Sequence, residues 1–214
     1  MFVRATAPRS AKPADSEALR PLIRSGKIEV IGEIQNQQLG LRADDPALDP
    51  MWRLAEENDV PVGIHMGGAI ALIGKDIRSA FRAELTSPFQ LEGVLKRHPK
   101  LRIYVMHAAM PLTDEMTLML FTYPSLYVDI SANDWNMPRA QFYDHLKRLV
   151  DAGFSKRIMF GSDQTIFPQA IGLAIKTIED APFLTAEQKR DIFYSNAARF
   201  LRLSPAQIAA DHRR

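Results

Sequence analysis

The chain has 214 residues, of which 46% are hydrophobic and 24% charged, a composition ordinary for a globular protein. Its 27 Lys and Arg against 25 Asp and Glu are mixed along the sequence, which argues against a nucleic-acid-binding surface. The absence of cysteine excludes disulfides, thiolate zinc sites and cysteine nucleophiles. We find no 18-residue apolar run and no signal-peptide pattern, so we expect a cytoplasmic protein without a membrane partner, unless upstream sequence changes this.

The first half of the chain reads as alternating strands and helices. A short strand at 2–7 and a helix at 16–24 lead to a strand ending at Glu33. Asp49 is predicted to cap a helix whose first position is Pro50. Ser87 and Pro88 repeat this pattern before a helix around 91–97, which His98-Pro99 ends.

The second half continues the alternation. Helices are predicted at 113–121 and 139–151, the latter broken by Gly153, with strands ending at Asp129 and Asp163. Thr185 and Gln188 have the spacing of a capping box, and Ser204-Pro205 opens a last turn. Strand starts lie roughly 25 to 40 residues apart, as in βα units with a parallel sheet.

Five apolar, β-branched runs each end on a residue that can bind a metal or move a proton. They are IEVIGE to Glu33, PVGIH to His65, LRIYVMH to His107, SLYVD to Asp129 and RIMFGSD to Asp163. Catalytic groups of α/β folds lie at the carboxyl ends of the strands. The only glycine-rich candidate, Gly67-Gly68, is no dinucleotide or phosphate motif and reads as a tight loop. Chemistry spread over several strand ends therefore favours a (β/α) barrel over a doubly wound sheet, and we expect one domain over 1–214.

Imidazole and carboxylate at these ends predict a metal site. Zn, Mn, Fe, Co and Ni ions accept such ligands and lower the pKa of bound water. Taken singly, His65 and His107 could be core histidines, and Asp163 could cap a following helix. Glu33 could be a ligand, a partner of a neighbouring histidine or, our preference, a carboxylate behind the ligands. Asp129 could either support the site in the same way or cap a loop.

The remaining histidines are weaker candidates. His98, beside a helix stop, is predicted to be exposed to solvent. His145 is expected to pack on a helix face, and His212 lies in a basic tail.

Several of these segments resemble the metal-dependent amidohydrolase superfamily, specifically amidohydrolase family 2, related to aminocarboxymuconate-semialdehyde decarboxylase. The matching pieces are PVGIH at 61–65, HPKLRI at 98–103 leading to His107, LYVD at 126–129, RIMFGSD at 157–163 and YSNAARFL at 194–201. The resemblance spans about residues 16 to 203 and implies a (β/α)8 barrel of the TIM type. It implies that His65 binds one divalent metal ion, Zn above all, and that His107 contacts the catalytic water or substrate. Asp163 would bind the metal or act as a base, and Asn196 would be a helix cap.

The chain also departs from the family pattern. Family members open with a strand carrying His-x-His or Glu-x-His, and this sequence contains neither. Five to six of the eight barrel strands can be assigned, so the barrel is expected to be incomplete at the N-terminus. With fewer ligands, this chain is expected to bind metal weakly and to have little activity.

The resemblance implies a metal-dependent hydrolase that attacks an ester, lactone or amide of a small carboxylated substrate with a metal-activated water. The alternatives are non-oxidative decarboxylation of an aromatic or muconate-type acid, and an inactive barrel that serves as a binding or interface module. Arg4, with Arg9, could hold a substrate carboxylate, and Trp135 could line the substrate pocket or pack elsewhere. A homodimer is consistent with the resemblance.

Overall fold

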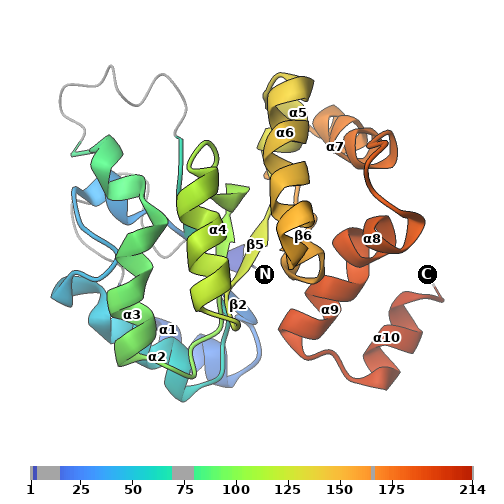
Figure 1. Cartoon of the computed structure of the whole chain (residues 1–214). Coiled ribbons are helices and arrows are strands. Elements are labelled where there is room, and N and C mark those ends of the chain that lie inside the picture. The colour runs from blue at the N-terminus through green and yellow to red at the C-terminus, as the bar shows by residue number, and fades with distance from the viewer. Residues whose placement is uncertain (1, 4–14, 69–79, 165–166, 214) are drawn as a thin grey trace. The chain divides into compact units, whose positions relative to one another are not determined.

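A computed structural model describes residues 2–3, 15–68, 80–164 and 167–213. Contacts within the chain divide it into two compact units, Met1–Leu126 and Tyr127–Arg214. Both units combine parallel strands with helices (Figure 1). The described residues contain six strands, in agreement with the five to six predicted, while the single domain over 1–214 stays a prediction.

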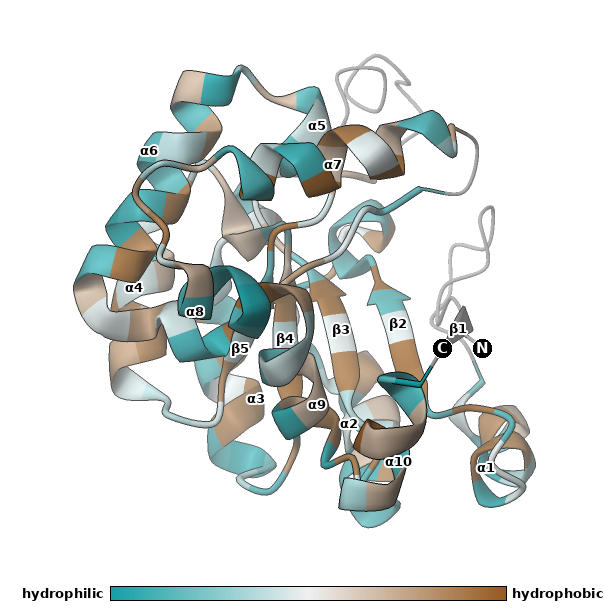
Figure 2. Ribbon diagram, turned by 90° about the vertical axis from the view of Figure 1, so that its right-hand side faces the viewer, coloured by the Kyte–Doolittle hydropathy of each residue, from teal (hydrophilic) through white to brown (hydrophobic). Residues whose placement is uncertain are grey.

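The first unit has four parallel strands in the order β1-β2-β3-β4. Figure 2 shows β2, β3 and β4 side by side, with hydrophobic residues along their lengths. The elements are β1 (Phe2–Val3), α1 (Ser16–Arg24), β2 (Val30–Ile34), η1 (Asn36–Leu39), η2 (Pro46–Leu48), α2 (Asp49–Glu57), β3 (Val62–His65), η4 (Ala83–Thr86), η5 (Pro88–Gln90), α3 (Leu91–Arg97), β4 (Ile103–Met106), η6 (His107–Ala109) and α4 (Thr113–Thr122).

The core of this unit follows from the apolar runs of the sequence. Val62, Ile64, Ile103 and Val105 are fully buried, as expected for strands covered by helices. The predicted helix at 16–24 is confirmed, and α3 ends where His98-Pro99 predicts.

One predicted cap is wrong. Asp49 is the first residue of α2 and not its N-cap, because the short helix η2 runs directly into α2. Asp45 caps that earlier turn by accepting a hydrogen bond from the backbone of Ala47. The carboxylate of Asp49 is thereby left for Arg53, Arg97 and His98.

The second unit contains the parallel pair β5–β6 and the remaining helices. Its elements are β5 (Tyr127–Asp129), α5 (Asn133–Asn136), α6 (Arg139–Leu149), the π-helical turn η7 (Val150–Phe154), η8 (Ser155–Arg157), β6 (Ile158–Met159), α7 (Gln169–Glu179), α8 (Ala186–Arg190), the π-helical turn η9 (Asp191–Ser195), α9 (Asn196–Leu201) and α10 (Pro205–Asp211). The capping box of Thr185 and Gln188 is present as predicted. Gly153, at φ 90°, breaks the helix as predicted.

The side chain of Asn196 has a larger role than that of a cap. The residue stands at the C-cap position of η9. Its amide donates to the carbonyl oxygens of Ser155 and Ile158, and its oxygen accepts from Arg199. The buried amide therefore fixes the start of β6 against α9.

No helix among the described residues is both long and apolar enough to span a bilayer.

Candidate metal centre

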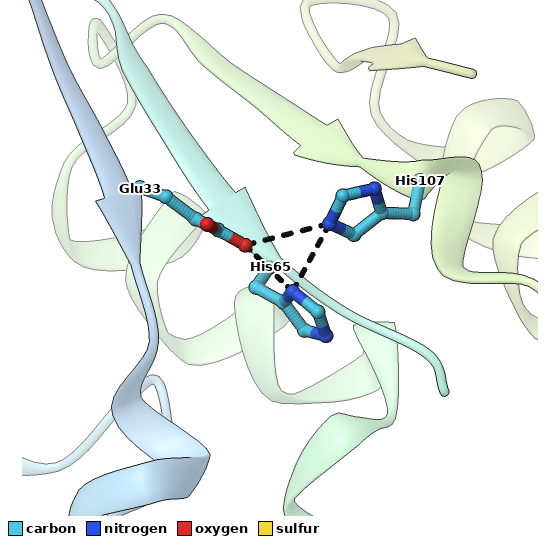
Figure 3. Close-up of side chains that lie close together, drawn as sticks. All are labelled: Glu33, His65 and His107. Atoms are coloured by element: carbon cyan, nitrogen blue, oxygen red, sulfur yellow. Dashed lines mark hydrogen bonds and ion pairs between the residues drawn. The ribbon is translucent and has the colours of Figure 1, made fainter. Parts of the chain in front are cut away.

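Three side chains meet where the strands of the first unit end. Glu33 lies in β2, His65 is the last residue of β3, and His107 follows β4 directly. Figure 3 shows the three side chains pointing toward one another. Parallel strands end at the same edge of a sheet, so residues 32 and 42 positions apart in sequence come together here.

The facing atoms are close enough to share one ion. Nδ1 of His65 lies 2.6 Å from Oε1 of Glu33. Nε2 of His107 lies 3.1 Å from that Nδ1 and 3.4 Å from the same oxygen. In a tetrahedral zinc site with bonds of about 2.05 Å, neighbouring ligand atoms are about 3.3 Å apart. In an octahedral site with bonds of about 2.1 Å they are about 3.0 Å apart. The two distances from His107, 3.1 and 3.4 Å, match these values, whereas the Glu33–His65 distance of 2.6 Å is shorter than either and is that of a hydrogen bond.

The hydrogen bonding of His65 points its free nitrogen at the cluster. Its Nε2 lies 3.1 Å from the carbonyl oxygen of Gly68, which can only accept, so Nε2 carries a hydrogen. In the neutral ring Nδ1 then presents a lone pair to the Glu33 carboxylate, which also carries only lone pairs and has no hydrogen to donate. A proton or a cation must lie between the two. Because Nε2 of His107 faces the same point, the donor set suits a divalent cation.

The cluster is partly removed from water. The side chains of Glu33, His65 and His107 are 10%, 13% and 7% exposed. Burial by itself would raise the pKa of the Glu33 carboxyl. With a proton between Glu33 and His65, hydrogen bonds from His107 and His65 outweigh burial and hold that pKa far below its usual range. Glu33 is therefore an anion at neutral pH, as a metal ligand must be.

Two strand-end loops lock together to position His107. Gly68 donates its backbone N–H to Met110, and Gly67 donates to Thr86. Gly67 has a φ of 86°, and a Cβ there would lie 2.4 Å from the Met110 carbonyl oxygen. His107 itself has a φ of 61°. The tight loop predicted at Gly67-Gly68 thus packs against the loop that carries His107.

The other predicted site residues belong to the second unit or to undescribed segments. Asp129 is buried, and its Oδ1 accepts from both the backbone and the hydroxyl of Ser131, as in the loop-capping alternative. Asp163 is exposed and lies four residues beyond Met159, the last residue of β6, and not at its end as predicted. The chain leaves the sheet early because Phe160 donates its N–H to Ile192, in η9, and not to a strand. Arg4 and Arg9 lie outside the described residues.

Trp135 is half-buried in α5 and donates its indole N–H to the carbonyl oxygen of Ser162, at 2.8 Å. This bond ties α5 to the loop that carries Asp163. A role for Trp135 toward a substrate stays a prediction.

Two carboxylate–histidine contacts in the structure differ from the preferred sequence predictions. Glu33 stands among the candidate ligands, in the first of the roles left open for it, and not behind them. His98 is 5% exposed, so its predicted exposure is wrong. Nδ1 and Nε2 of His98 each lie 3.1 Å from a different carboxylate, those of Glu56 and Asp49. The available signal was two carboxylates on the same face of α2 and about two turns apart, at positions 49 and 56.

Parallel strands whose carboxyl ends bring together two imidazoles and a carboxylate form a candidate metal site of the kind found in barrel proteins. A family model described as amidohydrolase matches residues 4–203, so the chain belongs to the amidohydrolase family, as the resemblance indicates. This family is metal-dependent.

Solved structures support the TIM-barrel type of fold. An uncharacterized TIM-barrel protein from Bordetella bronchiseptica is 21% identical, with a TM-score of 0.69 over 94% of this chain and 65% of that one. The 5-carboxyvanillate decarboxylase of Sphingomonas paucimobilis is 18% identical, with a TM-score of 0.60 over 92% of this chain and 65% of that one. A dihydroxybenzoic acid decarboxylase of Polaromonas, with bound manganese, is 15% identical, with a TM-score of 0.57 over 88% and 65%. The chain thus spans about two thirds of the length of these proteins.

Proposed function

We propose that this protein is a metal-dependent hydrolase that cleaves an ester, lactone or amide bond of a small carboxylated substrate. The convergence of Glu33 Oε1, His65 Nδ1 and His107 Nε2 on one point carries the proposal. Membership of the amidohydrolase family supports it. Zinc is the ion that the nitrogen-rich donor set favours, with manganese the alternative.

Each residue of the cluster has a definite task in this proposal. A divalent ion held there would supply Lewis-acid chemistry, polarising the scissile carbonyl and acidifying water. The Gly68 carbonyl fixes the His65 ring so that Nδ1 faces inward. Oε1 of Glu33 faces both imidazoles and would bind the ion together with them. The pKa of Glu33, held far below its usual range by its histidine neighbours, keeps the carboxylate anionic as a ligand and makes it a weak base.

A second candidate reaction is non-oxidative decarboxylation of an aromatic acid. Its support is the likeness to two decarboxylases of such acids, one of them with manganese. Both reactions use a carboxylated substrate and the same cluster. They differ in the bond that breaks.

The test begins with metal. The purified protein is stripped with a chelator, loaded with Zn²⁺ or Mn²⁺, dialysed, and analysed for metal per chain by mass spectrometry. The proposal requires one ion per chain, lost in Glu33→Gln and in His65→Asn. An ion retained through dialysis would also refute the weak metal binding expected from the missing N-terminal ligands. His98→Asn is the matched control, because it removes another buried imidazole–carboxylate contact of the same unit. Equal metal content in all four proteins would refute the cluster as the metal site.

The loaded protein is then assayed with lactones, esters and amides of small carboxylic acids in ¹⁸O water, and with hydroxybenzoates. Hydrolysis places one ¹⁸O in the product acid, whereas decarboxylation releases CO₂ and leaves no label on carbon. CO₂ release alone would replace the first candidate by the second. Metal binding without either reaction would favour a binding or interface module.

A further inference from the structure

A buried tyrosine, Tyr104, lies on β4 below the candidate metal site, toward the amino ends of the strands. Strands β3 and β4 pair residue for residue, with Gly63 opposite Tyr104 and His65 opposite Met106. Neighbours in register on parallel strands point to the same face, and side chains alternate along each strand. Gly63 and Tyr104 therefore share the face of His65, one layer of about 6.6 Å toward the amino ends of the strands.

The phenol ring of Tyr104 fills the space that Gly63 leaves open. A Cβ at Gly63 would lie 2.5 Å from both Cζ and Oη of Tyr104, and 2.9 Å from Cε1. The ring thus reaches across from β4 to β3 and lies against the Gly63 backbone. Its burial, with 8% exposed, shows that it is enclosed on its other sides. Any larger residue at position 63 must displace the ring.

We propose that Tyr104 is a positioning residue for the candidate metal site and that it acts by holding the His65 side chain in place. Its ring and Gly63 form a platform in the layer directly below His65, and this platform limits how far the imidazole can tilt away from Glu33. The Gly68 carbonyl restrains the outer nitrogen of that imidazole. The Gly68 carbonyl and the platform together keep Nδ1 of His65 at 2.6 Å from Oε1 of Glu33. The functional role of the platform rests on the proposed metal site, but its effect on His65 does not.

Three variants separate the parts of the platform. Tyr104→Leu removes the ring, Gly63→Ala displaces it, and Tyr104→Phe keeps it while removing the hydroxyl. Ile64→Val is the control, because Ile64 is fully buried on β3 but points to the opposite face. Thermal unfolding confirms that each variant is folded and shows how much stability it has lost.

The first readout is the ¹⁵N spectrum of the His65 imidazole in the metal-free protein. We expect Tyr104→Leu and Gly63→Ala to shift its Nδ1 and Nε2 signals, and Tyr104→Phe and Ile64→Val to leave them in place. The second is titration with Co²⁺ followed by visible absorption. The first two variants should weaken Co²⁺ binding about tenfold, a loss typical of groups that orient ligands.

Unchanged His65 signals in Tyr104→Leu and in Gly63→Ala would overturn the proposal. So would equal shifts in Ile64→Val, since these would reflect lost stability alone. If Co²⁺ fails to bind the wild-type protein while the His65 signals respond as expected, the metal site is refuted and the platform stands.

Discussion

Two clusters of histidine and carboxylate in the first unit differ in how their atoms are aimed. At the carboxyl ends of the strands, Glu33, His65 and His107 turn three ligand atoms toward one point. Near the start of β4, His98 turns its two nitrogens in different directions, to Asp49 and Glu56. Convergent lone pairs can share a cation, whereas a ring between two carboxylates can only join elements together. The same residue types therefore give a candidate metal centre in one place and a structural link between α2 and α3 in the other.

The largest difference is expected in metal affinity. His107→Asn should weaken Zn²⁺ binding by about 100-fold or more, because a ligand costs at least as much as an orienting partner. His98→Asn should leave the affinity within about twofold, a change near the scatter of a few tenths of a kcal/mol. Isothermal titration calorimetry on the stripped proteins measures both. If the two variants bind alike, the distinction between convergent and divergent clusters fails.

Gly67→Ala should disturb the first cluster and spare the second. The new Cβ would meet the Met110 carbonyl at 2.4 Å, in a backbone conformation with φ of 86° that alanine rarely adopts. We expect a loss of about 3 kcal/mol in unfolding free energy, from strain and steric overlap together. Urea denaturation measures this change in unfolding free energy. Gly26→Ala is the control, since its φ is 70° but a Cβ there meets nothing within 4 Å.

His98→Leu should show that the second cluster is structural. It leaves the partly buried carboxylates of Asp49 and Glu56 without their shared donor, which we expect to cost about 2 kcal/mol of unfolding free energy, less than for a fully buried pair. Denaturant titration checks the loss, and metal content should not change. Wild-type stability in this variant would mean that the contacts of His98 with Asp49 and Glu56 do not stabilise the packing of α2 against α3.

The smallest expected effect is the pH dependence of the stability that Asp49 contributes. Hydrogen bonds from His98, ahead of those from Arg53 and Arg97, hold the pKa of Asp49 below its usual range despite some desolvation. A carboxyl with a lowered folded-state pKa stabilises the fold fully above the unfolded value of about 3.9, and this contribution disappears as the pH falls through the folded value. Asp49→Asn should therefore cost about 1 kcal/mol at pH 7 and progressively less below pH of about 4. Unfolding measured from pH 7 to pH 3 tests this; a difference independent of pH would assign the effect to packing.

The sequence by itself determined the strands of the first unit and the residues at their ends. Apolar runs bounded by helix signals specify β3 and β4, and parallel strands bring their carboxyl ends to one edge, so His65 and His107 could be paired from the pattern alone. Family motifs then indicated amidohydrolase membership, which the family match over residues 4–203 confirms.

Only the tertiary structure decided what each polar side chain faces. The sequence has Glu33 and His98 beside an apolar run and a helix stop, but their partners are 32 and 42 residues away. Asp49 was predicted as a cap and instead binds His98, because a preceding turn capped by Asp45 supplies the helix start. Periodicity fixes which face a side chain takes, while its partners depend on contacts between elements that no local pattern encodes. The platform of Gly63 and Tyr104 is of this kind: the glycine is visible in the sequence, and the ring lying over it is not.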